Sequence, residues 1–315
     1  MTDLVVVIPV FNEEQNIMLL YDRLVGVVRS LNQSYRFIFI NDGSRDNTLQ
    51  KLKELASKDK QVKYIDLSRN FGHQVAVTAG LHFSKGKRVV IIDADLQDPP
   101  ELIVDMNKKM NEGWNVVYAR RKQRKGESFF KRITARIFYR LLKSITSVDI
   151  PVDTGDFRMM DWKVVEVLNR MPEQHKFIRG MVSWVGFKQT FVEYDRDQRH
   201  SGKTGYTFSK MLRFAIDGIT GFSNIPLKVA TWVGFGISFV SFALILYTLY
   251  ARFVSGNYVQ GWASLMISIL FIGGIQLICL GLIGEYIIRM DANLRQRPLY
   301  IINDTNAVDD ENIVS

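Results

Sequence analysis

The chain has 315 residues, 47% of them hydrophobic, which is enough for two domains and a sizeable core. Its only cysteine, Cys279, excludes a disulfide within one chain. The net charge of +9 suits an anionic partner, and the long apolar stretches near the C-terminus favour a membrane surface over a nucleic acid.

Strands and helices are expected to alternate over the first 119 residues. Apolar runs rich in β-branched residues predict strands at 4–10, 36–40, 62–67, 88–92 and 114–119. Helical spacing of apolar residues predicts helices from Ile17 to Val28, from Asp46 or Asn47 to Ser57, and over 72–83 and 100–111. This order is typical of an α/β protein with a doubly wound, mostly parallel sheet.

A carboxylate cluster follows the strand at 88–92. If the backbone stays extended there, Asp93, Asp95 and Gln97 project on one side, because side chains along a strand alternate. Mg²⁺ and Mn²⁺ prefer such oxygen ligands, usually together with substrate phosphates. Asp and Pro also commonly end strands, so the cluster alone leaves both interpretations open.

Acidic residues recur at the ends of the other expected strands, at Glu13 and Glu14, Asp42 and Asp66. The carboxyl ends of parallel strands share one edge of a sheet, where ligands bind. The sequence contains neither G-x-x-x-x-G-K-S/T nor a G-x-G-x-x-G after a strand, so a P-loop and a dinucleotide-binding turn are both disfavoured. A nucleotide and metal site of another kind is expected at this edge.

The second half of the chain is basic and then apolar. A basic amphipathic helix over 128–145 and a second amphipathic helix over 206–223 suit a membrane interface, although the first also fits an ordinary domain helix. Apolar stretches at 227–250 and 262–288 are each long enough to cross a bilayer. Lys and Arg flank the outer ends of this pair, which places both ends in the cytosol.

The glycines of the second stretch offer surfaces for close helix packing, within one chain or in a homo-oligomer; they are Gly273, Gly274, Gly281 and Gly284. The N-terminus lacks the basic start and cleavage site of a signal peptide, so we expect the front domain to be cytosolic. The acidic tail from Asp304 to Glu311 is expected to be disordered.

Four motifs occur in order along the chain: Val7–Glu14, Asn41–Thr48, Asp93–Pro100 and Thr154–Arg158. With them the chain resembles the family 2 glycosyltransferases of GT-A fold. The pair of apolar stretches adds a resemblance to the polyprenyl-phosphate glycosyltransferases, the group that contains the bactoprenol glucosyltransferases and dolichol-phosphate mannose synthase. The loop Arg196–Tyr206 resembles a phosphate-binding loop of this group, but His200 and Gly202 depart from its pattern.

The resemblance implies a role for individual residues. Pro9, Glu14 and Asp42 would cradle the base and ribose of a nucleotide, and Asp93, Asp95 and Gln97 would hold Mg²⁺ or Mn²⁺ and the diphosphate. Asp156 and Asp95 take the catalytic positions. The resemblance also implies that phosphate groups bind to four basic residues: Arg120, Arg158, Arg199 and Lys203.

The role of Asp156 has three interpretations. It matches the position usually assigned to a catalytic carboxylate. An acceptor phosphate, however, has a second pKa of about 6 and is already largely ionised at neutral pH, so it hardly needs a base. Asp156 would then orient the acceptor or a sugar hydroxyl, and a purely structural turn after Gly155 is the third possibility.

The expected enzyme is an inverting transferase that moves glucose from UDP-glucose to undecaprenyl phosphate or a related polyprenyl phosphate. Open alternatives are GDP-mannose or a UDP-aminosugar as donor, a processive polysaccharide synthase, and a non-catalytic membrane scaffold. The expected parts are a cytosolic GT-A domain (1–205), an interfacial helix (206–226), a two-span membrane domain (227–290) and a cytosolic, partly disordered tail (291–315).

Overall fold

The computed structural model describes residues 2–121, 154–174, 176–194 and 261–307, and a few residues between 232 and 243. Several expected segments lie outside these residues: the basic helix at 128–145, the loop at 196–206 with Arg199 and Lys203, the amphipathic helix at 206–226 and most of the first apolar stretch at 227–250.

Within the described residues, eight strands form one sheet in the order β7-β5-β6-β4-β1-β2-β3-β8. The strands are β1 (Thr2–Val10), β2 (Tyr35–Asn41), β3 (Val62–Leu67), β4 (Gly86–Ile91), β5 (Val116–Arg121), β6 (Thr154–Asp161), β7 (Gln189–Tyr194) and β8 (Ile302–Thr305). Four neighbouring pairs are parallel, whereas β6 is antiparallel to β4 and β5, and β8 is antiparallel to β3. The expected doubly wound, mostly parallel sheet is confirmed.

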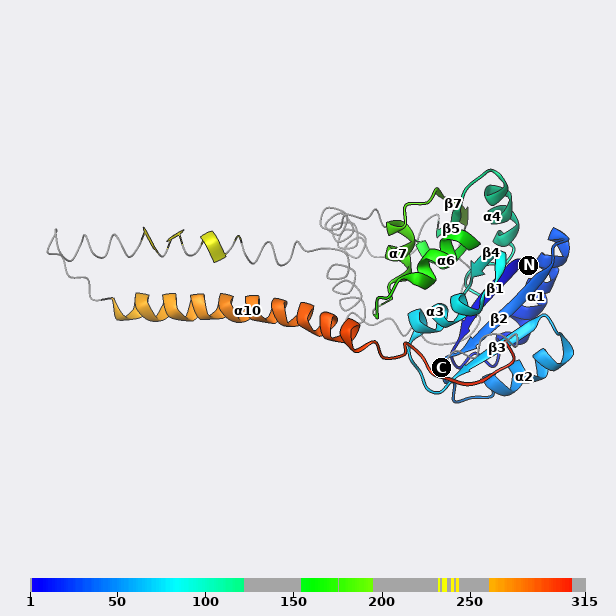
Figure 1. Ribbon diagram of the computed structural model, residues 1–315, viewed down its shortest axis with the longest axis horizontal. Coiled ribbons are helices and arrows are strands. Elements are labelled where there is room, and N and C mark those ends of the chain that lie inside the picture. The colour runs from blue at the N-terminus through cyan, green and yellow to red at the C-terminus, as the bar shows by residue number, and fades with distance from the viewer. Residues whose placement is uncertain are drawn as a thin grey trace.

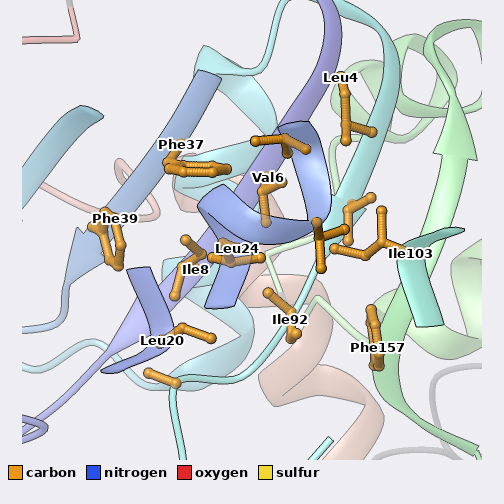
Figure 2. Packing of buried hydrophobic residues seen from close by; sticks show 14 of the residues in the cluster. Leu4, Val6, Ile8, Leu20, Leu24, Phe37, Phe39, Ile92, Ile103 and Phe157 are labelled. Atoms are coloured by element: carbon orange, nitrogen blue, oxygen red, sulfur yellow. The ribbon is translucent and has the colours of Figure 1, made fainter. Parts of the chain in front are cut away.

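Helices cover both faces of the sheet (Figure 1). One face packs against α1 (Ile17–Leu31), α2 (Thr48–Lys58) and α4 (Leu102–Asn111), and the other against α3 (His73–Phe83), α6 (Trp162–Arg170) and α7 (Ile178–Trp184). Strand β1 serves both cores because its side chains alternate: Leu4, Val6 and Ile8 face α1, as Figure 2 shows, while Val5 and Val7 face α3.

The strands and helices expected up to residue 119 lie within a few residues of the observed ones. The order of strands in the sheet differs from a simple continuation of that pattern, because β6 inserts between β4 and β5. Local apolar spacing predicts that a segment is a strand, but it does not predict which other strand that segment pairs with.

The C-terminal part corrects one expectation. Helix α10 (Trp262–Arg295) extends well away from the α/β body (Figure 1) and runs past the expected end at Ile288. The chain then returns to the sheet as β8, so the tail is ordered as far as Ala307 and does not become disordered at Asp304. Among the described residues, α10 contains the one segment that is long and apolar enough to cross a membrane, Phe271–Arg295.

Gly80 marks the closest contact between α3 and the sheet. A Cβ atom there would lie 2.3 Å from Cγ1 of Val7 and 2.7 Å from Cδ1 of Ile40. Both neighbours are fully buried, so neither side chain has room to move. Gly80 therefore allows the helix to approach strands β1 and β2.

We expect Gly80→Ala to destabilise the protein by about 1–3 kcal/mol through overpacking. The matched control is Gly26→Ala in the middle of α1, where a Cβ atom meets nothing within 4 Å. That variant should be neutral or stabilising by up to about 1 kcal/mol, because alanine is the better helix former. The midpoints of thermal unfolding of the two full-length variants test this, and equal midpoints would contradict the packing argument.

Candidate active site

The antiparallel direction of β6 determines where the candidate site forms. Ile91, at the end of β4, pairs with Arg158 of β6. Asp156 therefore lies two residues beyond this pair, beside the turn that begins at Asp93. The beginning of β6 thus brings a carboxylate to the edge at which the parallel strands β1 to β4 end.

Asp156 is a buried carboxylate at the centre of a cluster of charges. Arg179 of α7 donates from Nε to Oδ1 of Asp156 at 2.8 Å and from Nη2 to Oδ2 at 3.2 Å. Nε2 of His73, the first residue of α3, lies 3.1 Å from the same Oδ2 and 3.5 Å from Oδ1 of Asp93. Nε2 of Gln74 also donates to Oδ2 of Asp156, at 3.3 Å. One imidazole therefore stands between two carboxylates that come from different strands.

The charges of this cluster shift one another's pKa values. Burial alone raises the pKa of Asp156, but Arg179 and His73 hold it well below its usual range. Burial lowers the pKa of His73, yet Asp93 and Asp156 together raise it to about 9, so the imidazole is positively charged at neutral pH. A carboxylate with so low a pKa is a weak base, which favours an orienting role for Asp156.

Asp93 to Gln97 form a turn, not an extended strand. Strand β4 ends at Ile91, Leu96 has a left-handed φ of 57°, and the backbone N–H of Gln97 donates to Oδ1 of Asp95 at 3.2 Å. The expected side-by-side projection of alternate residues along a strand is therefore wrong in its geometry. Leu96 adopts the conformation that reverses the chain before Pro99 and Pro100.

The turn nevertheless offers ligands for a divalent ion. Oδ1 of Asp93 is buried and accepts no hydrogen bond within the described residues, and burial together with Asp156 and Asp95 raises the pKa of Asp93. The nearest cation is Nε2 of His73 at 3.5 Å, too far for a good hydrogen bond. Because a buried carboxylate oxygen without a hydrogen bond is costly, it is a natural position for a metal cation. In the described part of the chain no three His, Cys, Asp or Glu side chains group as a metal site. Substrate phosphates and water would therefore have to complete the shell of an ion held here.

The loops after β1 and β2 lock together. The backbone N–H of Asn12 donates to Oγ of Ser44 at 2.9 Å, and the N–H of Asn47 donates to Oε2 of Glu14 at 3.0 Å. Pro9 is buried within β1, directly before this loop. The structure brings Pro9, Glu14 and the loop after β2 together at the expected edge, although the carboxylate of Glu14 caps the start of α2.

Asp42 has a structural partner as well. Its carboxylate is 3% exposed and accepts hydrogen bonds from the backbone N–H groups of Phe71 at 2.7 Å and Gly72 at 3.0 Å. These contacts fix the loop that leads into His73. Asp42 therefore connects the loop after β2 to the charged cluster.

The expected phosphate ligands differ in their surroundings. Arg158 is buried and donates to the carbonyl oxygens of Asp156 at 3.2 Å and Gly155 at 3.1 Å, so it holds the backbone of its own motif. Arg120, at the end of β5, pairs with Glu193 and stacks on the ring of Phe191, and its side chain is 38% exposed. Of these two cations, Arg120 is the more accessible to a ligand.

Sequence reasoning missed three members of the site: His73, Gln74 and Arg179. The available signal was the position of His73 and Gln74 at the start of a helix that follows a strand end, an edge where ligand-binding groups gather. Arg179 had no such signal, because α7 approaches the edge only through tertiary packing against α6 and the sheet.

Comparison with known proteins gives the family. The family model described as glycosyl transferase family 2 matches residues 5–168, and a second model, described as the GtrB C-terminal hairpin, matches residues 225–290. The chain is 48% identical to the uncharacterized glycosyltransferase YkcC of Bacillus subtilis, covering 98% of this chain and 95% of that protein.

Two further relatives have more specific names. The chain is 40% identical to the prophage bactoprenol glucosyl transferase homolog of Escherichia coli, covering 94% of this chain and 97% of that protein. It is also 40% identical to the bactoprenol glucosyl transferase of Shigella phage SfV, covering 95% and 97%. The resemblance carried by the four motifs is confirmed, and the chain is a glycosyltransferase that belongs to glycosyl transferase family 2.

Proposed function

We propose that this enzyme transfers glucose from UDP-glucose to a polyprenyl phosphate such as undecaprenyl phosphate, with inversion at the anomeric carbon. The observation that carries the proposal is the 40% identity to bactoprenol glucosyl transferase over nearly the whole of both chains, together with the match to the C-terminal hairpin model. Relatives named as transferases to this lipid favour it over a processive synthase or an idle scaffold.

In this proposal the turn after β4 holds Mg²⁺ or Mn²⁺. Asp93, Asp95 and Gln97 supply oxygen ligands, and Oδ1 of Asp93, which accepts no hydrogen bond within the described residues, supports the assignment. When bound, the ion neutralises the charge that develops on the leaving diphosphate. Pro9, Glu14 and Asp42 frame the base and ribose at the neighbouring strand ends.

The acceptor phosphate is the nucleophile and arrives already ionised. Asp156 then has no proton to remove, and its pairing with Arg179 and His73 suits it to orient the acceptor or a sugar hydroxyl. Arg120 is our candidate for a direct phosphate contact, and Arg158 supports the site through the backbone that it holds. Arg199 and Lys203 keep their proposed phosphate-binding role on sequence grounds alone.

The lipid acceptor requires a membrane location, and α10 supports one. Large apolar side chains on this helix are exposed, with Leu277 at 71% and Ile288 at 62%. A soluble protein rarely exposes such a continuous apolar surface. We propose spans at 227–250 and 262–288, with the catalytic domain (1–205), the interfacial helix (206–226) and the tail (291–315) on the cytosolic side.

Self-association through the membrane helices is part of the proposal. Among the residues that the structure describes, a Cβ atom added at Gly273, Gly274, Gly281 or Gly284 would meet nothing within 4 Å. These positions therefore present open, small-residue surfaces on α10 against which another helix can pack closely.

A panel of labelled nucleotide sugars identifies the donor. Membranes that contain the enzyme, incubated with Mn²⁺ and each sugar, should transfer label from UDP-glucose into the lipid extract. Label from GDP-mannose or a UDP-aminosugar alone would replace the proposed donor. Label in long polymer instead of lipid would favour a processive synthase, and the absence of any transfer would favour a scaffold.

We expect Asp95→Asn to abolish transfer while the protein still folds and inserts, because an amide is a much weaker ligand for a hard cation. Mn²⁺-dependent binding of UDP, measured by calorimetry, should be lost as well. Asp105→Asn is the matched control, since Asp105 lies on α4 and pairs only with the exposed Lys108 in the contacts described. Full activity of the Asp95 variant would refute the metal assignment.

His73→Gln should lower kcat/KM by about 10²-fold, comparable to the loss of one preorganised electrostatic group. The variant keeps a hydrogen-bond donor but removes the positive charge between Asp93 and Asp156. The measurement is the initial transfer rate over donor concentrations from well below KM upward, from which kcat/KM follows, with the thermal midpoint as the control for folding. A kcat/KM within twofold of the unchanged enzyme would show that the charge of His73 is not needed.

A further inference from the structure

The segment Tyr300–Ala307, called here the C-terminal strap, ties the end of α10 to the sheet. Its strand β8 pairs with β3, and Oδ1 of Asn306 accepts a hydrogen bond from the backbone N–H of Tyr64 at 2.7 Å. The carbonyl oxygen of Ile301 accepts another from the N–H of Ser68 at 2.9 Å. The strap therefore covers the edge strand and continues alongside the loop that follows it.

One side chain of the strap reaches the edge that carries the active site. Nδ2 of Asn303 donates to Oδ2 of Asp66 at 2.8 Å, while Oδ1 of Asp66 accepts from Nδ2 of Asn41 at 2.7 Å. Asp66 is 4% exposed. A buried carboxylate needs such partners, so Asn303 completes a polar chain across the ends of β2, β3 and β8.

The loop 68–72 lies between this chain and the nucleotide edge. On one side Gly43 approaches it so closely that a Cβ atom would lie 2.5 Å from the carbonyl carbon of Arg69, and Asp42 caps the N–H groups of Phe71 and Gly72. On the other side the strap binds Ser68. The next residue in the chain is His73, so both contacts bear on the charged cluster.

The strap also contacts the far end of α3. Nδ1 of His82 lies 2.8 Å from the hydroxyl of Tyr300, and Tyr300 and Ile302 pack against the same core as Phe71. Helix α3, with His73 at its start, is thus held by the strap near its last turn and by the loop 68–72 at its beginning. A second contact, from the backbone N–H of Gln174 to Oδ1 of Asn293 at 3.0 Å, joins α10 to the loop before α7, but the strap is the link that reaches the ends of β2 and β3.

We propose that Asn303 is a positioning residue of the active site, which acts through Asp66 and the loop 68–72. Through it the C-terminal strap couples the membrane helix to the part of the site that holds the nucleotide. The inference rests on the proposed function, because it assigns the ends of β2 and β3 to nucleotide binding.

The test compares Asn303→Ala with Asp304→Asn in the full-length enzyme. Asp304 lies on the same strand but points to the other side, where it binds Nζ of Lys53 at 2.6 Å and the hydroxyl of Tyr64 at 3.1 Å. Asn303→Ala removes the hydrogen bond to Asp66, whereas Asp304→Asn removes the ion pair with Lys53 and can still accept from the hydroxyl of Tyr64. Only Asn303→Ala should raise KM for the nucleotide sugar, by about tenfold, the size expected for one hydrogen bond to a charged group, with kcat within twofold.

Calorimetry of UDP with Mn²⁺ on the same proteins supplies a second measurement. Weaker binding to the Asn303 variant, with a thermal midpoint equal to that of the Asp304 variant, supports positioning. Equal KM and equal binding in both variants overturn the inference and leave the strap as a simple edge strand.

A substitute variant and the unchanged enzyme complete the comparison. Asn303→Ser, which also removes the amide donor, takes the place of the alanine variant if that protein fails to accumulate. An unchanged enzyme that binds no UDP overturns the proposed function and this inference together, whereas binding that is equal in the unchanged enzyme and the variants overturns the inference alone.

Discussion

The candidate site depends on the charge balance around Asp156. This buried carboxylate pairs with Arg179 and His73, which come from two helices on one face of the sheet. Removing either partner leaves the charge of this buried carboxylate less compensated, which destabilises the folded protein. His73 also approaches Asp93, so the same cluster controls the position of the turn after β4. The packing of α3 and α7 onto the sheet therefore determines the geometry of the candidate site.

The fold was largely predictable, because long apolar runs at the period of a strand or helix depend only on local sequence. Asp93 and Asp156 were recognised from their motifs, yet their proximity follows from the antiparallel direction of β6, which no local pattern encodes. The alternation argument for Asp95 and Gln97 failed at Leu96, a non-glycine residue with positive φ. The role of Arg179 could not be predicted for the same reason as the position of β6 in the sheet, because both come from tertiary packing.

The buried charges also change what the chemistry asks of each residue. Asp156 is ionised and already accepts hydrogen bonds from strong donors. If it accepted a proton as a general base, it would lose contacts that hold the cluster together. When no metal ion is bound, the positive charge beside Asp93 comes from His73. The groups that we propose to hold the leaving diphosphate and those that we propose to orient the acceptor are thus linked through one imidazole, so a change in the charge of either group alters the other.

The connection from α10 to the sheet limits where the acceptor can react. Only five residue steps separate Arg295, the last residue of α10, from Tyr300 of the strap, a span of at most about 18 Å. A long flexible linker would let the catalytic domain sample many heights above a bilayer, whereas this short one, fixed by hydrogen bonds along β3, allows few. The phosphate of a membrane lipid stays at the headgroup level, so in the membrane location that we propose a narrow range of heights would keep the candidate site where that phosphate is found.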